Sequence, residues 1–274
     1  MSLFQVDPAK CKRDKICVTV CPLGLIEFNS GSQVPSPVKG ADDLCVSCGH
    51  CVSVCPAGAL SHRAMTPAQC TPVNPALTVT AEQAEQLLRS RRSVRAYRAD
   101  AVDRELLSRL IATASFAPSG HNTQPVEWLV VRDSSAVKRI ATLVIEWMRF
   151  MIREKPDFAK AILLEHVVDK WEQGVDAVCR SAPHLVITHA HRDNMMAPSA
   201  STIALAYLDL AARSHGLGAC WAGYVDVAAK YFPPLQKELA LPEGHVNNGA
   251  MMLGYPKYKY HRVPLRKEAR ITWK

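Results

Sequence analysis

Apolar side chains recur at helical spacing in several stretches beyond residue 80. Thr80 and Gln83 have the spacing of a capping box and predict the start of a first helix, with Leu87 and Leu88 on its buried side. The stretch 103–118 predicts a second helix, because its leucines and alanines share one face and a proline follows them.

Two longer patterns predict buried helices. One contains Trp and Met among its apolar positions between Val137 and Met151, and we interpret this stripe as core. The other, 199–214, is small and apolar on much of its surface, which suits a central helix or a subunit interface. Three short apolar runs predict strands, at 126–131, 184–188 and 248–255.

Residues 63–79 show no apolar periodicity. They contain Pro67, Pro72 and Pro75 and predict a semi-rigid linker. We therefore expect an N-terminal domain at 1–62, this linker, and a larger domain at 80–274. The length of 274 residues is sufficient for a small domain attached to a larger one.

The N-terminal domain contains an internal repeat. "CKRDKICVTVCP" (11–22) aligns without a gap with "CVSCGHCVSVCP" (45–56), 34 residues later. Apolar and glycine positions nearby match at the same offset, so two half-domains related by pseudo-symmetry are expected. One position breaks the repeat, since Asp14 stands where the second copy has Cys48.

The second copy has the spacing C-x2-C-x2-C-x3-C-P, through Cys45, Cys48, Cys51 and Cys55. This spacing is typical of bacterial iron–sulfur proteins, in which the fourth cysteine binds the other of two clusters. Cysteine pairs also bind zinc, but zinc motifs seldom place three cysteines at this spacing before a Cys-Pro. The sequence therefore predicts iron–sulfur clusters.

Residues 5–62 resemble the two-cluster bacterial ferredoxins. The resemblance implies crossed ligation, in which each copy supplies one ligand to the cluster of the other copy. It assigns one [4Fe-4S] cluster to Cys45, Cys48, Cys51 and Cys21, and the other cluster to Cys11, Cys17 and Cys55 with Asp14. Residues 29–41, rich in Ser, Gly and Pro, then form the loop that joins the halves.

Three interpretations of Asp14 are open. Its carboxylate, a harder donor than thiolate, ligates iron and completes a [4Fe-4S] cluster with a shifted potential. Alternatively the corner iron is absent, and Cys11, Cys17 and Cys55 hold a [3Fe-4S] cluster. In the third interpretation this half binds no cluster and Asp14 is a surface residue, but the retention of three cysteines argues against it.

The net charge of +8 is concentrated in two stretches. Residues 255–274 carry seven Lys or Arg and one acid, and five arginines lie between Arg89 and Arg98. Such clusters suit either a solvated basic tail or a site for a phosphorylated cofactor. No DNA- or RNA-binding motif accompanies them, so we expect no nucleic-acid partner.

The chain shows no export signal and no apolar run near the roughly 18 residues needed to span a bilayer. We therefore expect a cytoplasmic protein with no membrane partner, whose ten cysteines are reduced. Cys70, Cys179 and Cys220 lie outside the cluster motifs, and the sequence assigns them no function.

Three stretches of the larger domain carry, in order along the chain, arginines, loop amides and further cations. They are "RRSVRAYR" (91–98), "APSGHNTQPVEW" (117–128) and "GYPKYKYHRVPLRK" (254–267). Together, in this order, they resemble the FMN-dependent nitroreductase family across residues 80–274. The resemblance implies an α+β fold with an antiparallel sheet, and a homodimer with one FMN at each subunit junction.

The resemblance also implies how the chain holds FMN. Arg91, Arg92, Ser93 and Arg95 match the stretch that contacts the phosphate, ribityl chain and ring edge, and Arg262 matches a C-terminal phosphate contact. Guanidinium groups suit this task because they bind phosphate through two hydrogen bonds.

Further expected contacts come from a loop of the partner subunit and from a segment whose backbone faces the flavin ring. They are Pro118, Ser119, Gly120, Asn122, Gln124, Trp221, Ala222 and Gly223. Many relatives have an acidic residue in place of Ala222. We assign no catalytic residue, because the cofactor carries the chemistry and no acid–base pair is needed.

No G-x-G-x-x-G motif follows a strand, and "GLGACWAG" (216–223) lacks the third glycine, so no Rossmann site for NAD is expected. We expect an FMN-dependent oxidoreductase whose clusters relay single electrons to FMN. The flavin then delivers a hydride equivalent to a nitroaromatic, quinone or activated alkene. The external electron donor is reduced ferredoxin or NAD(P)H.

Two other functions are open at this stage. The chain can serve as an electron-transfer adaptor that docks to a larger redox partner, with the flavin domain as a storage or interface module. It can also be a dehydrogenating or ring-fragmenting flavoenzyme, because relatives of the fold run oxidative chemistry.

Overall fold

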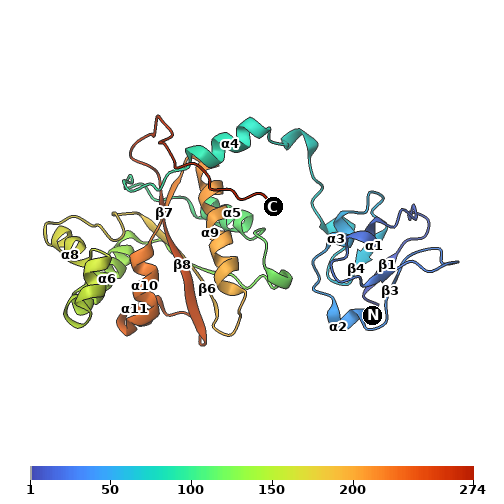
Figure 1. Cartoon of the computed structure of the whole chain (residues 1–274), viewed down its shortest axis with the longest axis horizontal. Coiled ribbons are helices and arrows are strands. Elements are labelled where there is room, and N and C mark those ends of the chain that lie inside the picture. Colours follow the sequence, from blue (N-terminus) through green and yellow to red (C-terminus); the bar gives the residue numbers. More distant parts are fainter. Residues whose placement is uncertain (1) are drawn as a thin grey trace. The chain divides into compact units, whose positions relative to one another are not determined.

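The computed structural model describes residues 2–274 and divides them into two units (Figure 1). The first contains the chain up to Thr78 together with His121–Thr123, and the second contains Val79–Gly120 and Gln124–Lys274. We refer to them as the N-terminal and C-terminal domains. Within residues 2–274, none of the helices has both the length and the apolar character needed to cross a membrane.

The N-terminal domain consists of short elements around a small core. Its strands are β1 (Phe4–Val6), β2 (Ile26–Glu27), β3 (Ser36–Pro37) and β4 (Leu60–His62), and its helices are α1 (Ile16–Val20), α2 (Ala41–Leu44) and α3 (His50–Ser53). Two 3-10 turns follow, η1 (Pro67–Gln69) and η2 (Pro75–Leu77). Strand β1 pairs with β4 and β2 with β3, both antiparallel. Met65 and Cys70, beyond β4, pack against the core of this domain.

The backbone of the N-terminal domain repeats with the offset of 34 residues seen in the sequence. Gly24 and Gly58 both adopt left-handed backbone, with φ of 62° and 58°. In each copy the cysteine before Pro accepts a hydrogen bond on Sγ from the N–H four residues later, at 3.3 Å. The pseudo-symmetry predicted from the cysteine repeat is therefore confirmed.

The C-terminal domain is built on a four-stranded sheet. Its strands are β5 (Glu127–Val131), β6 (His184–His191), β7 (Gly218–Trp221) and β8 (His245–Gly254), in the order β5-β6-β8-β7. All neighbouring pairs are antiparallel, as predicted. The sequence did not predict β7, because this strand has only four residues, begins at a glycine and shows no alternation.

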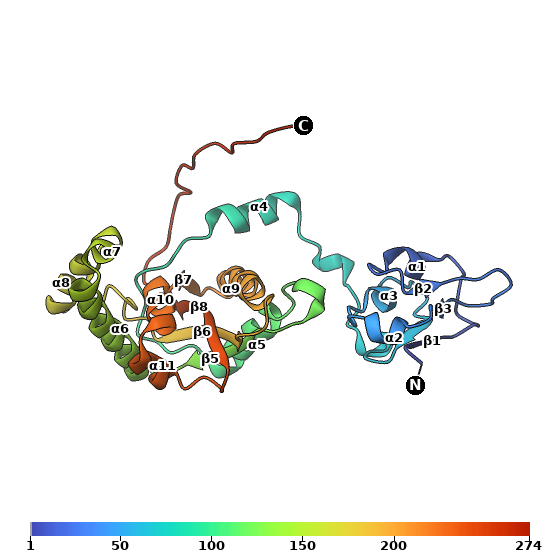
Figure 2. The ribbon, with the colours of Figure 1, turned by 60° about the horizontal axis from the view of Figure 1, so that its bottom comes forward.

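Helices cover both faces of the sheet (Figure 2). They are α5 (Arg104–Ala114), α6 (Ser134–Glu154), α7 (Pro156–Ala161), α8 (Leu164–Glu172), α9 (Ala197–Ser214), α10 (Gly223–Tyr231) and α11 (Pro233–Leu239). The chain also forms α4 (Ala81–Ser90), which contributes to neither core, and a 3-10 turn η3 (Gly120–Asn122). Successive side chains of β6 alternate between two cores. Leu185 and Ile187 face the core of α6, α8, α10 and α11, whereas Val186 faces the core of α5 and α9.

The helices predicted from the sequence are all present, but the prediction of which side of α4 is buried was wrong. The capping box at Thr80 and Gln83 is confirmed, and Val137, Trp147 and Met148 of the apolar stripe are buried. Leu88, however, is 58% exposed, and α4 contributes no residue to either core. The prediction was wrong for Leu88, whereas Leu87 is half-buried, because α4 packs on neither face of the sheet.

Gly218 lets the stretch 91–98 lie close against β7. The N–H of Val94 donates to the Ala219 carbonyl at 3.0 Å, and a Cβ at position 218 would lie 2.3 Å from Val94 Cγ2. We expect Gly218→Ala to lower the free energy of unfolding by about 1–3 kcal/mol, the usual effect of overpacking.

Thermal unfolding of the full chain measures this effect. Gly216→Ala is the control, since its Cβ would meet nothing within 4 Å and only its positive φ of 71° is unfavourable. Equal losses for the two variants would contradict the proposed role of the close approach.

Candidate cluster and flavin sites

Four cysteines of the N-terminal domain surround one small cavity. Cys21, which follows α1, lines a cavity of about 30 Å³ with Cys45, Cys48 and Cys51, which surround the start of α3. Its other walls include the apolar side chains of β1 and β2. The grouping is the crossed set that the ferredoxin resemblance implies, with three cysteines from one copy and one from the other.

The half-buried thiols of this cavity suit a cationic ligand. Burial, together with the neighbouring Cys48 and Cys45 thiolates, raises the pKa of the Cys51 thiol to about 11. Without metal the protonated Cys51 thiol is therefore favoured, and bound iron would supply the positive charge that keeps it ionised. His62 is buried beside them, with Nε2 3.5 Å from Cys45 Sγ.

A second group gathers around Cys17. Burial raises the pKa of the Cys17 thiol, and the nearby Cys55 and Asp14 raise it as well. Asp14 is exposed, and its Oδ1 accepts a hydrogen bond from the Ile16 N–H at 3.2 Å, at the start of α1. The structure thus brings Asp14 together with Cys17 and Cys55, while Cys11 is half-buried a few residues earlier.

In the C-terminal domain the arginine-rich stretch 91–98 runs along the edge of the sheet. Besides the bond from Val94 to β7, the Arg98 N–H donates to the Tyr255 carbonyl and the Lys257 N–H donates to the Ala96 carbonyl, both at 2.9 Å. The stretch is therefore held between β7 and the chain that follows β8. Because the backbone of the stretch is extended, its side chains lie on two sides of it.

On one side lies a cavity of about 640 Å³ with many cationic side chains. The cations are Arg91, Arg92, Arg98, Arg213, Lys257 and Lys259, and the only carboxylate among the lining residues is Asp209. A concave site with this excess of positive charge favours an anionic ligand.

Asp209 of α9 holds one of these cations. Its Oδ2 lies 2.9 Å from Arg91 Nη1, and the carboxylate is almost fully buried. Burial raises the pKa of Asp209, whereas the Arg91 guanidinium opposes that shift. The pair fixes the position of Arg91. Asp209 was not predicted as a site residue, although it is the single acid within the apolar pattern 199–214.

On the other side, Ser93 and Arg95 lie near Cys220 of β7. Burial raises the pKa of the Cys220 thiol, and Arg95, Arg180 and a hydrogen bond from Ser93 act against this. Trp221 follows and is 40% exposed, while the Ala222 N–H donates to the Ala250 carbonyl at 2.8 Å. Ala222 then caps α10, which leaves the first N–H groups of this helix without intrahelical partners.

The remaining predicted contacts lie elsewhere. Arg262 is exposed and does not line the cationic cavity. Ser119 and Gln124 line a separate cavity of about 190 Å³, where the Gln124 N–H donates to Ser119 Oγ at 2.9 Å. Asn122 groups with the N-terminal domain.

The loop that contains these residues has an unusual backbone. His121, Asn122 and Gln124 have φ of 50°, 53° and 44°. Left-handed backbone at consecutive non-glycine residues is unfavourable and is found most often at functional sites.

Comparisons with known proteins match both domains. Residues 88–255 match the model of the nitroreductase family, and residues 5–59 match that of the 4Fe-4S dicluster domain. An NADH dehydrogenase of Thermus thermophilus is 32% identical over 202 residues, which are 67% of this chain and 92% of that protein. A protein named ferredoxin 7Fe, from Hydrogenibacillus schlegelii, is 31% identical over 67 residues, which are 24% of this chain and 80% of that protein.

The fold is also shared with solved structures. A nitroreductase with bound FMN from Desulfitobacterium hafniense superposes with a TM-score of 0.54 at 20% identity, over 69% of this chain and 96% of that one. The family model spans more than half of the chain, and the arrangement of sheet and helices agrees with it. The chain is therefore an oxidoreductase of the nitroreductase family that carries a 4Fe-4S dicluster domain at its N-terminus.

Proposed function

We propose that the chain is an FMN-dependent oxidoreductase whose N-terminal clusters supply single electrons for the two-electron reduction of nitroaromatic, quinone or activated alkene compounds. The observation that carries the proposal is the presence, in one chain, of four gathered cluster cysteines, a second group of Cys17 with Cys55 and Asp14, and a cation-lined cavity beside the arginine stretch. Flavin converts between one-electron and two-electron chemistry, and the protein supplies binding, orientation and charge.

The residues of the C-terminal domain fit FMN in their chemistry. The phosphate of FMN is a dianion, and the cationic cavity offers Arg91, already oriented by Asp209, together with Arg92. Ser93 and Arg95 lie on the other side of the same short stretch, where they can serve the ribityl chain and the ring edge. Arg262, on the C-terminal stretch, adds a further phosphate contact in this proposal.

The start of α10 suits the flavin ring. Trp221 and Ala222 precede this helix, and Gly223 is its first residue, so unpaired backbone N–H groups and the positive end of the helix dipole lie together there. Both favour negative charge, which develops on a reduced flavin ring. These backbone contacts do not depend on the side chain at position 222, where Ala222 replaces the acid of many relatives.

We propose a homodimer in which the loop at Pro118, Ser119 and Gly120, with Asn122 and Gln124, completes the flavin site of the partner. Two observations support this. The loop lies outside the cationic cavity of its own chain, and its backbone is strained. A site that needs both subunits also explains why α9 is small and apolar on much of its surface.

For the cluster that includes Asp14 we propose the three-iron form, held by Cys11, Cys17 and Cys55. The Asp14 carboxylate already accepts the Ile16 N–H, and the relative that matches this region is named for seven irons. The other cluster, on Cys21, Cys45, Cys48 and Cys51, is then a [4Fe-4S] cluster.

Removal of an arginine should weaken FMN binding. We expect Arg92→Ala and Arg95→Ala each to raise the dissociation constant of FMN about tenfold or more, because a hydrogen bond to a charged group contributes about 1.5–3 kcal/mol. Titration of the apo-flavin protein, followed by flavin fluorescence, measures this. Arg109→Ala, an exposed arginine of α5, is the control and should bind FMN normally. Unchanged affinity in both test variants would refute the assigned site.

Iron content tests the role of Asp14. Protein purified without oxygen should contain about seven irons per chain, Asp14→Cys about eight, and Asp14→Asn about seven. Eight irons in the natural chain, falling to seven in Asp14→Asn, would instead show that the carboxylate ligates iron. Electron paramagnetic resonance of the oxidised protein supplies an independent signature of the three-iron cluster.

The relay is tested by removing the [4Fe-4S] cluster. We expect the double variant Cys45→Ala/Cys51→Ala to reduce a quinone with reduced ferredoxin as donor at least tenfold more slowly, with an unchanged FMN content. Cys70→Ala, in the same domain but outside the motifs, is the matched control. If the double variant reduces the quinone as fast as the natural chain, with ferredoxin or with NAD(P)H as donor, the relay is not necessary.

A further inference from the structure

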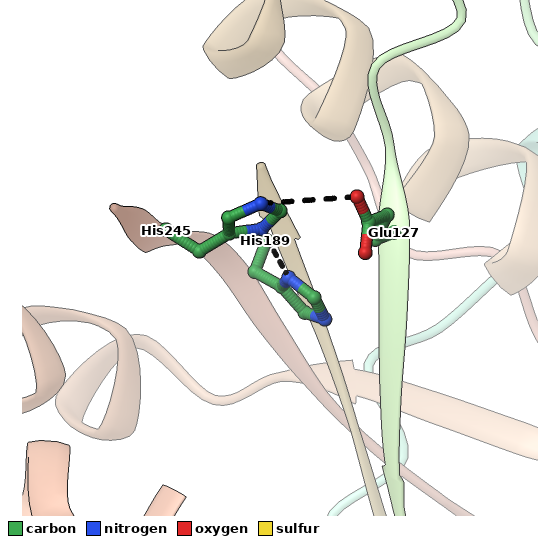
Figure 3. A group of neighbouring side chains, drawn as sticks. All are labelled: Glu127, His189 and His245. Atoms are coloured by element: carbon green, nitrogen blue, oxygen red, sulfur yellow. Dashed lines mark hydrogen bonds and ion pairs between the residues drawn. The ribbon is translucent and has the colours of Figure 1, made fainter. Parts of the chain in front are cut away.

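Three polar side chains meet on one face of the sheet, outside both sites described above. Glu127 lies on β5, His189 on β6 and His245 on β8, and Figure 3 shows the three side chains turned toward one another. Strands that are far apart in sequence thus supply two imidazoles and one carboxylate to a single point.

The three side chains are close enough for one ion to reach all of them, with a single nitrogen of His245 as its ligand. His189 Nδ1 lies 3.0 Å from His245 Nδ1, and His245 Nε2 lies 3.9 Å from Glu127 Oε1. One potential ligand atom from each residue lies within 4.8 Å of the other two. Two nitrogens bound to one tetrahedral zinc ion are about 3.3 Å apart, since each Zn–N bond is about 2.0–2.1 Å.

A bulge in the sheet creates this convergence. The pairing of β6 with β8 shifts between Thr188 and His189, so that His189 lies opposite Asn247 and His191 opposite His245. Without the shift, His191 would lie opposite Val246, and His245 would point to the other face of the sheet. Bulges of this kind re-aim side chains and are common beside functional sites.

The burial and the charge of these three side chains also suit a cation site. His189 is 6% exposed and the His245 side chain 13%, whereas Glu127 is 59% exposed and free to rotate toward a ligand. Burial lowers the pKa of the His189 imidazole, so its neutral, metal-binding form predominates near pH 7. The Glu127 carboxylate adds a harder oxygen donor to the two imidazoles, and this combination of donors suits a divalent cation.

We propose that Glu127, His189 and His245 bind a divalent transition-metal ion such as Zn²⁺. This ligand set leaves a fourth position for water or another small ligand. His245 also lines a cavity of about 700 Å³, through which such a ligand can approach. The metal would join β5, β6 and β8 at one end of the sheet.

His191 provides a matched control on the same strand. Its side chain lies on the same face and its ring centroid is 5.9 Å from that of His245, but it is 52% exposed and its Nδ1 lies near Asp193 Oδ2, at 3.5 Å. It is outside the group of three. A specific site should therefore depend on His189 and His245 and not on His191.

The first experiment is equilibrium dialysis of the full chain against buffered Zn²⁺, with no histidine tag and with clusters and flavin in place. We expect one zinc per chain in the natural protein and in His191→Ala. His189→Ala, His245→Ala and Glu127→Gln should each bind zinc at least tenfold more weakly, with unchanged iron and flavin contents. Zinc retained at full affinity by the two histidine variants, or no zinc in the natural protein, would overturn the proposal.

A second measurement does not depend on how the variants fold. X-ray absorption at the zinc edge of the natural protein should show only nitrogen and oxygen neighbours, at about 2.0–2.1 Å. Sulfur neighbours at about 2.3 Å would mean that zinc occupies cluster cysteines, and the proposed site would then be wrong.

Discussion

The pairing of β6 with β8 is the contact on which the C-terminal domain depends. These two strands form the middle of the sheet, and the side chains on their two faces enter the two separate cores. Strand β8 also holds β7, and β7 holds the stretch 91–98 that carries the arginines. The flavin site we propose is thus built outward from one antiparallel ladder. The same ladder, through its bulge, aims His189 and His245 at each other.

Charge is the second constraint on this domain. The cationic cavity is lined by six basic side chains, and the single carboxylate of Asp209 offsets only part of their charge. Such an arrangement repels itself in the absence of an anion, so binding of a phosphate group relieves it and stabilises the folded state. The buried pair of Asp209 with Arg91 is costly to desolvate but keeps the guanidinium in one position. Both effects lower the stability of the domain, but they leave the cavity ready to bind an anion.

The N-terminal domain has a different source of stability. Its core contains seven buried side chains, several of which lie against the cysteines. A core of this size contributes little free energy, and metal clusters usually compensate in small domains. The thiols gathered around the small cavity repel one another when ionised, which iron would reverse. Folding of this domain and cluster assembly are therefore expected to be coupled.

The sequence by itself determined most of the local structure. The cysteine repeat determined the pseudo-symmetry, because two copies of one pattern adopt the same local backbone. The capping box at Thr80 and the apolar stripe from Val137 determined where helices form, since both signals act within a few residues. The order of the arginine, loop and C-terminal stretches was enough to identify the family.

Only the tertiary structure decided which distant residues meet. Asp209 pairs with Arg91 across 118 positions, and no local pattern encodes that contact. The short strand β7 forms because β8 provides a partner, and Leu88 stays exposed because α4 finds no core to pack on. Glu127, His189 and His245 converge through strand order and a one-residue bulge. A single step in register reverses the face of every following side chain, so this convergence depends on the assembled sheet.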